Sequence, residues 1–494
     1  MRRTMQTTSF GQKIFAGSMW TVLMRWMSRL LGIISMIILA RILVPEDYGL
    51  VAQAVLLSSF LELMTQFGFF TALLRDKDAN SDDYHTAFTL SLIRGLVLAV
   101  VVAASAGLVA DFFDEPRLTD LVLVYAVVTF LNGTVNVGIV DFQKEFRFNE
   151  DFKLNITSRF SGFLVTLMIA VIYESYWAFP LGTLVATLVK VFCSYHMVSF
   201  KPRIALKNFY HIFNFSKWFF LFEAFNAASN KVDTFLIGKF GSPAELGIYT
   251  VSKEVAGLPT TELAMPVARA SLPVLARHVD DLPEFGNLYT SVLISVLVLA
   301  LPAVAGISVL SEHLVLLLLG PRWSEAATLL PILAFIAVTK VSVACAIPAL
   351  AALGRASLLS RYSVTMLIVK SLLMGAGIMY YGVIGLAWGA LAAGILGVLM
   401  IHFIQRKLGI LSLGRLFAGL WRSILATATM AAVVASVKVN YPADGTQANM
   451  VITPLLVMLG CSVYMVSLML LWVLAKRPDG FERNAFNLMK NMVK

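Results

Sequence analysis

Long apolar segments follow one another along almost the whole of this chain of 494 residues. Crossing a bilayer core of about 30 Å takes about 20 helical residues, and a backbone in lipid must satisfy its own hydrogen bonds. By this measure the sequence predicts an all-α integral membrane protein with about fourteen transmembrane helices. The expected spans cover approximately residues 13–43, 47–74, 85–110, 117–140, 153–173, 178–199, 212–240, 245–274, 286–309, 324–352, 357–379, 383–404, 415–437 and 449–474.

The amino-acid composition excludes most soluble classes of protein. Hydrophobic residues make up 59% of the chain and charged residues 14%. Soluble globular chains are about 45–50% apolar and about 25% charged. A chain with this surplus has too few polar residues to cover a water-exposed surface, which excludes a disordered protein, a disulfide-rich secreted scaffold and a cytosolic enzyme.

Residues that hold metals or carry out catalysis do not cluster in the sequence. The cysteines Cys193, Cys345 and Cys461 lie far apart inside apolar runs, and the six histidines are isolated. A zinc site, a disulfide framework, a nucleophile–base pair and a glycine-rich phosphate loop all lack support. We therefore expect no catalytic residue, no metal, no cofactor and no nucleic-acid partner, and a chain that is not an enzyme.

Lys and Arg are distributed unevenly between the loops, which predicts the orientation of the chain. With a cytoplasmic N-terminus, the cytoplasmic span ends and loops hold twenty-three basic residues and the opposite side holds five. Those five are Arg41, Arg117, Lys239, Arg322 and Lys438. Both termini are therefore expected in the cytoplasm, which fits an even number of spans.

Eleven basic residues remain within the expected spans, against five acidic ones. The basic residues are Arg25, Arg29, Arg94, Arg159, Lys190, Lys231, Lys253, Arg269, Lys340, Lys370 and Arg422, and the acids are Glu62, Glu223, Asp233, Glu254 and Glu262. A charge at mid-bilayer costs at least about 2.5–3.5 kcal/mol, so it faces a water-filled cavity, reaches an interface or has a partner. Lys190, Lys370 and Arg422 lie near span ends, where we expect them to reach the interface.

Three matches in the same order along the chain indicate a diverged internal repeat. They pair Pro45 with Pro243 and Gly49 with Gly247 at an offset of 198, Pro116-Arg117 with Pro321-Arg322 at 205, and Gly182 with Gly389 at 207. The repeat predicts two parallel six-helix lobes around a central cavity, in residues 1–208 and 209–408. Two further helices and a cytoplasmic tail follow in residues 409–494. Transporters with this plan bind substrate between the repeats and work by alternating access.

Polar side chains line one side of the first expected span. They are Thr21, Arg25, Ser28, Arg29, Gly32 and Ser35, at helical spacing. Helix packing through small residues explains the serines and Gly32 well, but it explains two arginines near mid-span poorly. We therefore favour a basic stripe that faces a cavity.

Other spans offer further candidates for substrate binding. The seventh span carries Glu223, Asn230 and Asp233 on one face, with Lys231 at its edge, and the eighth carries Lys253. This set is either a network that neutralises itself or part of a cavity wall, and both descriptions can hold together. Glu62 lies on the second span. Toward the cytoplasmic ends of the third and fifth spans, Arg94 and Arg159 either extend the basic stripe or meet lipid phosphates.

Three short segments carry a family resemblance. They are the run from Ala40 through Pro45 and Gly49 to Leu50, Leu246-Gly247-Ile248-Tyr249, and Leu353-Gly354-Arg355. They resemble the signature of Wzx-type polysaccharide flippases of the multidrug/oligosaccharidyl-lipid/polysaccharide (MOP) superfamily, above all its colanic-acid exporter branch. The likeness extends over almost the whole chain, with the last two helices least distinctive.

The resemblance implies a function. Such a flippase moves undecaprenyl-pyrophosphate-linked oligosaccharide from the cytoplasmic to the periplasmic leaflet of the bacterial inner membrane, for exopolysaccharide, O-antigen or capsule synthesis. A polysaccharide polymerase and export machinery would then be partners. It also implies that spans one, two, seven and eight line the cavity, which makes Arg25, Arg29, Lys231 and Lys253 the leading candidates for binding the pyrophosphate.

Three other functions remain in view. A multidrug antiporter of the same superfamily takes cationic drugs, but the first half of this chain has only Glu62 as an acid within a span. A lipid II flippase is nearer, and the sequence separates it poorly. A membrane-embedded polysaccharide polymerase or glycosyltransferase usually carries a sizeable periplasmic loop, and the longest outer connections here, about 310–323 and 438–448, hold no catalytic set. The sugar, the energy source and the oligomeric state are left open.

Overall fold

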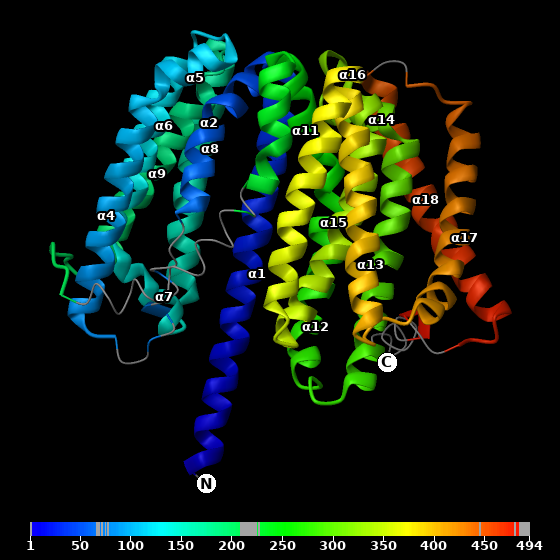
Figure 1. Cartoon of the computed structure of the whole chain (residues 1–494). Helices are drawn as coiled ribbons and strands as arrows, with labels where there is room; N and C mark the ends of the chain where they lie inside the picture. Colours follow the sequence, from blue (N-terminus) through cyan, green and yellow to red (C-terminus); the bar gives the residue numbers. More distant parts are fainter. Residues whose placement is uncertain are drawn as a thin grey trace. The chain divides into compact units, whose positions relative to one another are not determined.

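The chain is an all-α protein in the computed structural model, within the residues that the structure describes (Figure 1). Those residues are 2–65, 79–207, 228–443, 446–478 and 481–483, with single positions 70, 73, 74, 76 and 225 between them. In this part of the chain nine helices are long and apolar enough to cross a membrane, or ten if one bent pair is a single span. The prediction of an all-α, multi-pass membrane protein is therefore confirmed, and the count of fourteen helices stays a prediction.

Contacts divide the chain into two compact units, residues 1–247 and 248–494. The first unit contains α1 (Arg2–Ile42), α2 (Pro45–Met64), α4 (Ser81–Ala104), α5 (Ala106–Phe113), α6 (Leu118–Gly133), α7 (Val140–Lys144), α8 (Phe148–Tyr173), α9 (Ala178–Met197) and helical residues 228–240. Within it α8 packs on α1 and α9, and α6 packs on α2, α4 and α9.

The second unit contains most of α11 (Pro243–Pro259), a π-helical turn (Thr260–Ala264), α12 (Met265–Ala276), α13 (Leu282–Val309), α14 (Ser311–Leu318), α15 (Ala326–Ala352), α16 (Ala356–Lys407), α17 (Leu413–Lys438) and α18 (Thr446–Leu474). Here α13 packs against α12, α15 and α17, and α17 packs against α18. Fully buried Phe285 and Tyr289 of α13 lie in an apolar core of this unit, where Gln405 donates a hydrogen bond to the Tyr289 hydroxyl at 2.7 Å.

The long helix α16 contains two of the expected spans. Its backbone leaves the helical region at Tyr381 and Gly382, and Gly382 has a φ of 61° that favours glycine. The chain folds back at this point. The contact between its two arms shows this, since a Cβ at Gly377 would collide with the carbonyl of Gly385 on the other side of the break. The break falls between the predicted spans 357–379 and 383–404.

The helices of the two units repeat with the predicted offsets. In each unit a long helix ends at a break, Ser105 in one and Leu310 in the other, and an eight-residue helix follows, α5 and α14. The offset between the breaks is 205, the same as that between the two Pro-Arg pairs. Likewise a Cβ at Gly182 would meet Thr166, and one at Gly389 would meet Leu373, so each contact recurs at 207. The lobe boundaries proposed from the sequence stay predictions.

The two proline–glycine turns of the repeat touch each other inside the first unit. A Cβ at Gly49 would collide with the carbonyl of Pro243, and one at Gly247 would collide with the carbonyl of Pro45. The first turn of α2 and the first turn of α11 thus meet backbone to backbone, and each glycine provides the space for the other turn. The sequence match at an offset of 198 therefore has a structural reason, because each turn needs a glycine where the proline of the other turn packs against it.

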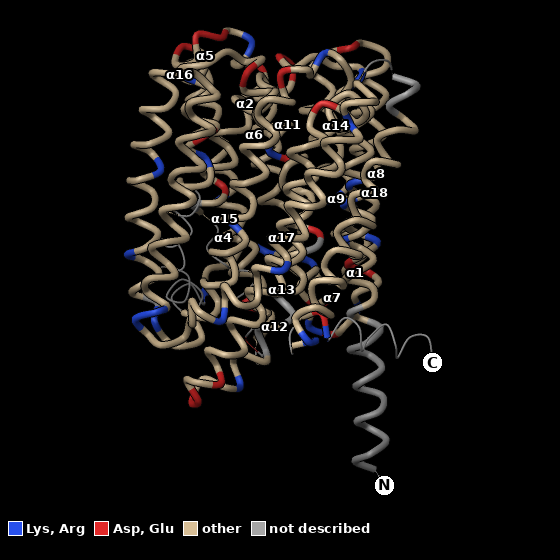
Figure 2. The backbone as a smooth tube through the Cα atoms, turned by 90° about the vertical axis from the view of Figure 1, so that its right-hand side faces the viewer, with Lys and Arg blue, Asp and Glu red and all other residues tan. Residues whose placement is uncertain are grey.

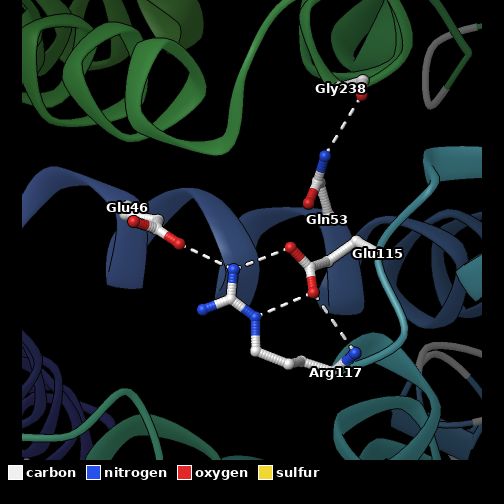
Figure 3. A network of polar contacts seen from close by, with 5 residues as sticks. All are labelled: Glu46, Gln53, Glu115, Arg117 and Gly238. Atoms are coloured by element: carbon white, nitrogen blue, oxygen red, sulfur yellow. Dashed lines mark hydrogen bonds and ion pairs between the residues drawn. The ribbon is translucent and has the colours of Figure 1, made fainter.

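Charged residues lie mostly toward the ends of the helices (Figure 2). At the end expected to face away from the cytoplasm, Arg117 binds Glu46 at 2.6 Å and Glu115 at 2.7 Å (Figure 3). The hydrogen bonds that the Arg117 guanidinium donates to Glu115 lower the pKa of that carboxyl group. Lys239 binds Asp114 at 3.4 Å and Lys438 binds Glu312 at 2.9 Å. Each of these three cations therefore has an acidic partner.

Candidate functional site

A cavity of about 450 Å³ lies within the first unit and is lined mostly by polar and small side chains, with Leu31, Phe163 and Phe179 adding apolar surface. Its walls come from α1, α8 and α9, with Asn132 contributed by α6. Every lining residue belongs to the first unit, so the cavity is defined without reference to the second. A polar hollow among apolar helices is the kind of place where a membrane protein holds a hydrophilic group.

The α1 wall of the cavity is part of the polar face expected from the sequence. Ser28, Gly32 and Ser35 line it, at i, i+4 and i+7 on one side of the helix. Gly32 is also exposed, and a Cβ built on it would meet no atom within 4 Å. The glycine therefore keeps open space rather than allowing close helix packing, which was the alternative interpretation of this residue.

Two basic side chains line the same cavity, Arg159 from α8 and Lys190 from α9. Their positive charges repel each other, and the charges of Asp151 and Glu62 act more weakly on Lys190. Neither side chain makes a hydrogen bond or ion pair with another residue in the described part of the chain. Because Arg159 also remains exposed, the cavity presents two cations that are available to an anion.

The remaining wall offers hydrogen-bond acceptors. The hydroxyls of Ser158, Thr183 and Thr187 each donate to a backbone carbonyl of their own helix, at 3.1, 2.8 and 2.9 Å. The oxygen lone pairs of Ser158 and Thr187 are left for other donors, whereas Thr183 also interacts with the Tyr125 hydroxyl. Asn155 is held in place by Asp151, through bonds of 2.8 Å to its carbonyl and 2.7 Å to its carboxylate. The cavity therefore combines cations with acceptors suited to hydroxyl groups.

Glu62 and Arg94 lie beside this cavity rather than in its lining. Asn132, which does line it, donates a hydrogen bond of 3.3 Å to Glu62 of α2. Arg94 of α4 donates to the Thr65 carbonyl at 3.1 Å, and its charge interacts with that of Glu62. The Nε of Arg94 is buried and has no hydrogen-bond partner among the described residues. The pair thus forms a polar layer next to Asn132.

Arg25 and Arg29, the leading candidates from the sequence, are not among the residues that line this cavity. Both are half-buried on α1. Arg25 is three residues before Ser28 and shares its face, whereas Arg29 is rotated by about 100° from Ser28. Their predicted contact with substrate stays a prediction.

The candidates from the seventh and eighth spans have mixed placements. Asp233 is buried, with its carboxylate accepting a hydrogen bond of 2.9 Å from the Thr234 backbone. Asn230 is exposed and Lys231 is half-buried. In the second unit, the Lys253 ammonium lies 5.8 Å from the ring centre of Tyr249. Glu223 lies outside the described residues.

Of the three cations expected to reach the interface, Arg422 is instead buried in an ion pair, and Lys190 lines the cavity. Lys190 lies seven residues before the end of α9, about 10 Å along the helix, and lines the cavity. Arg422 of α17 is 5% exposed and is bound to Glu482 at 3.2 Å. A signal for Lys190 was present in the sequence, because Thr183, Thr187 and Lys190 repeat at i, i+4 and i+7.

The described residues contain no group of three or more His, Cys, Asp and Glu side chains placed to hold a metal ion. The chemistry that the cavity does offer is binding of an anionic, hydroxyl-bearing group. The fold and this cavity define a multi-pass membrane protein with a hollow among its helices that Arg159 and Lys190 line.

Comparison with known proteins gives the family. The family described as "Polysaccharide biosynthesis protein" matches residues 38–328, which is more than half of the chain, so the protein belongs to that family. The chain is 23% identical to the lipopolysaccharide biosynthesis protein WzxC of Escherichia coli K12, over 81% of this chain and 82% of WzxC. It is 21% identical to the teichuronic acid biosynthesis protein TuaB of Bacillus subtilis 168, over 90% and 92%.

A solved structure shares the fold. The lipid II flippase MurJ in an inward closed conformation superposes with a TM-score of 0.73 at 15% identity, covering 94% of this chain and all of that one. At this identity the likeness concerns the fold. The resemblance to polysaccharide flippases drawn from the short segments is confirmed by the family match and these relatives.

Proposed function

We propose that this protein is a flippase that moves a lipid-linked oligosaccharide across the membrane for surface polysaccharide synthesis. The substrate is an oligosaccharide on undecaprenyl pyrophosphate, and it travels from the cytoplasmic to the periplasmic leaflet of the bacterial inner membrane. The family membership, the multi-pass fold and the chemistry of the cavity support this function. The protein acts as a transporter with no catalytic residue, metal or cofactor.

One observation carries the proposal, namely that Arg159 and Lys190 line the same cavity without ion-pair partners among the described residues. A diphosphate carries more than one negative charge, and a guanidinium binds its oxygens through two parallel hydrogen bonds. The lysine adds a point charge that adapts to the geometry of the ligand. The serine, threonine and asparagine side chains accept hydrogen bonds from sugar hydroxyls.

The lack of fixed partners also suits transport rather than storage. A flippase must bind its substrate and release it again. Its binding cations are therefore expected to be surrounded by water when the cavity is empty, and not to be bound to a permanent acidic partner. A substrate that enters this cavity replaces water around the two cations and gives it back on leaving. The apolar prenyl chain remains in lipid throughout.

The other predicted site residues take secondary roles in this proposal. Arg25 and Arg29 on α1 extend the basic surface of the cavity along the path of the headgroup. Glu62 and Arg94 hold Asn132 and its surroundings in place. Asn230, Lys231, Asp233 and Lys253 contribute further polar groups to substrate binding, and Glu223 is a candidate from the sequence alone.

The topology and the partners are part of the same proposal. Both termini lie in the cytoplasm, which follows from the concentration of Lys and Arg in the cytoplasmic loops. A polysaccharide polymerase and export machinery on the periplasmic side take up the flipped substrate. The lobes are residues 1–208 and 209–408, and residues 409–494 form two additional helices and a tail.

The proposal is tested in cells that depend on this gene for surface polymer. The variant Arg159→Ala/Lys190→Ala should lose the polymer and accumulate lipid-linked oligosaccharide, while the protein stays in the membrane. Lys153→Ala is the matched control, because Lys153 lies on the same helix but is 60% exposed and bound to Glu150. Normal polymer in the double variant would contradict the role of the cavity.

A second set of measurements separates the related transporters. Rescue of cells depleted of their lipid II flippase would assign the substrate to cell-wall synthesis. Efflux of a cationic drug by cells expressing the protein would assign it to the multidrug class, against which the two cavity cations argue. We expect neither.

A further inference from the structure

A second and larger cavity lies in the second unit, with a volume of about 750 Å³. It is lined by the first half of α13, the first three turns of α17 and the segment that follows α18. Both α13 and α17 start at the end of the helices where the sequence predicts the cytoplasmic surface. The cavity therefore lies toward the predicted cytoplasmic ends of these helices, beside Ala475, Pro478, Phe481 and Glu482.

Arg422 forms the inner end of this cavity. Its side chain is 5% exposed and that of Glu482 is 3% exposed, with 3.2 Å between Nε and Oε1. The only hydrogen bond between the two side chains is a long one of 3.4 Å, from Nη2 to Oε2. Nη1 is buried and has no hydrogen-bond partner among the described residues. Because arginine stays protonated, this donor calls for an acceptor from outside the described chain.

Arg415 lines the outer part of the same cavity. It lies seven residues before Arg422, so the two side chains share a face of α17 about 10 Å apart along the axis. Arg415 is exposed and makes no ion pair with the described residues. Two arginines against the single Glu482 leave the cavity with one net positive charge.

The rest of the lining fits a headgroup attached to acyl chains. Ser291 and Ser295 of α13 each donate to a carbonyl of their own helix, at 2.9 and 2.8 Å, and keep lone pairs for ligand hydroxyls. Ile294, Trp421 and Phe481 add apolar and aromatic surface. Trp421 is 47% exposed, as is common for tryptophan at a membrane interface.

We propose that this cavity binds the phosphodiester headgroup of an anionic glycerophospholipid from the adjacent leaflet. A phosphodiester carries one negative charge, which matches the net charge of the site. Its oxygens accept hydrogen bonds from Arg422 Nη1 and from the Arg415 guanidinium in the paired geometry that arginine favours. The bound lipid joins α13 and α17 to the segment that contains Phe481 and Glu482. This site is separate from the transport cavity, and its occupancy does not depend on the proposed function.

Thermal unfolding of the purified full-length protein in detergent tests the proposal. The probes are phosphatidylglycerol, a diacylglycerol with the same acyl chains, and inorganic phosphate. We expect phosphatidylglycerol to raise the unfolding midpoint by several degrees and the other two probes to leave it unchanged. An equal shift with diacylglycerol would overturn the headgroup contact, and an equal shift with inorganic phosphate would overturn the lipid as the source.

Variants locate the effect. Arg415→Gln should lose more than half of the shift, and Arg422→Gln/Glu482→Gln, which removes the buried pair as a whole, should abolish it. Arg361→Gln, an exposed arginine of the second unit outside the cavity, should keep it. If the double variant does not fold, Arg415→Gln tests the site on its own. If phosphatidylglycerol raises the unfolding midpoint of Arg415→Gln as much as that of Arg361→Gln, the proposed site is overturned.

Discussion

The two cavities of this protein differ in whether their arginines have an acidic partner. In the first unit Arg159 and Lys190 line one cavity, and neither has an ion-pair partner in the described part of the chain. In the second unit Arg422 is bound to Glu482, and both side chains are almost fully buried. Both cavities are polar hollows among apolar helices, so the difference lies in whether the chain supplies the counter-charge itself.

That difference separates transient from permanent binding. A cation with a fixed carboxylate is neutralised at all times, and the pair holds two segments together. A pair of cations without one is neutralised only while an anion is present, which favours a ligand that enters and leaves. The paired cations at the expected periplasmic end, such as Arg117 with Glu46 and Glu115, belong to the permanent kind.

The largest difference between the two cavities is expected in protein stability when one partner of the buried Arg422–Glu482 pair is replaced. Arg422→Gln leaves the Glu482 carboxylate buried without its partner, which should lower the free energy of unfolding by about 3–5 kcal/mol. Lys190→Gln removes a repelling charge and should cost less than about 1 kcal/mol. Thermal or denaturant unfolding in detergent measures both, and similar losses for the two variants would refute the distinction.

Converting one kind of cavity into the other sharpens the comparison. Lys190→Glu places an acid beside Arg159 and gives it a permanent partner, as Glu482 does for Arg422. We expect a folded protein whose export activity falls about 10- to 100-fold, because a charge-assisted hydrogen bond is worth about 1.5–3 kcal/mol. Full polymer export by this variant, measured against Lys190→Gln, would show that a fixed counter-charge is harmless there.

Filling the first cavity tests whether its open space is used. Gly32 has nothing within 4 Å of a built Cβ, so Gly32→Phe should place its ring in the hollow without disturbing the backbone. Export should fall by about tenfold, equivalent to about 1.4 kcal/mol, at an unchanged level of membrane protein. Gly32→Ala should behave like the unaltered protein. Equal export by both variants would mean that substrate does not pass this wall.

The smallest effect concerns acid stability at the expected periplasmic end. The Arg117 guanidinium lowers the pKa of Glu115 from its ordinary value of 4.5, so the ion pair stabilises the fold at neutral pH. That contribution is lost as the pH falls below about 4.5 through the lowered pKa. Glu115→Gln should be less stable at pH 7 by under about 1 kcal/mol, because Arg117 is 42% exposed. The difference in stability between the two proteins should shrink as the pH falls through the lowered pKa of Glu115, and a difference that stays constant would exclude this ionisation as the cause.

The membrane helices could be predicted from the sequence because apolar runs of sufficient length have few other solutions. The break in α16 at Gly382 falls between two predicted spans, and the α5 and α14 helices, which were not predicted, recur at the same offset of 205 as the two Pro-Arg pairs. The polar face of α1 was also visible, since Ser28, Gly32 and Ser35 repeat at helical spacing. These features depend on residues that are close in sequence or on a strict period.

Pairings between distant segments could not be predicted in the same way. Arg422 finds its acid sixty residues later, beyond the last span, where no pattern marks Glu482 as buried. Lys190 was assigned to the interface because its distance from the span end was short in sequence. Its place in the cavity is set by the packing of α9 on α8, which leaves Lys190 and Arg159 in the same hollow.

The central claim is that Arg159 and Lys190 bind the anionic headgroup during translocation. The direct test reconstitutes the purified protein in liposomes with a fluorescent undecaprenyl-pyrophosphate-linked oligosaccharide and measures how fast the sugar becomes accessible to a glycosidase outside. The account predicts translocation by the unaltered protein and by Lys153→Ala, and a rate at least about 100-fold lower for Arg159→Ala/Lys190→Ala, because two charge-assisted contacts are lost. Equal rates for the double variant and the unaltered protein would contradict it.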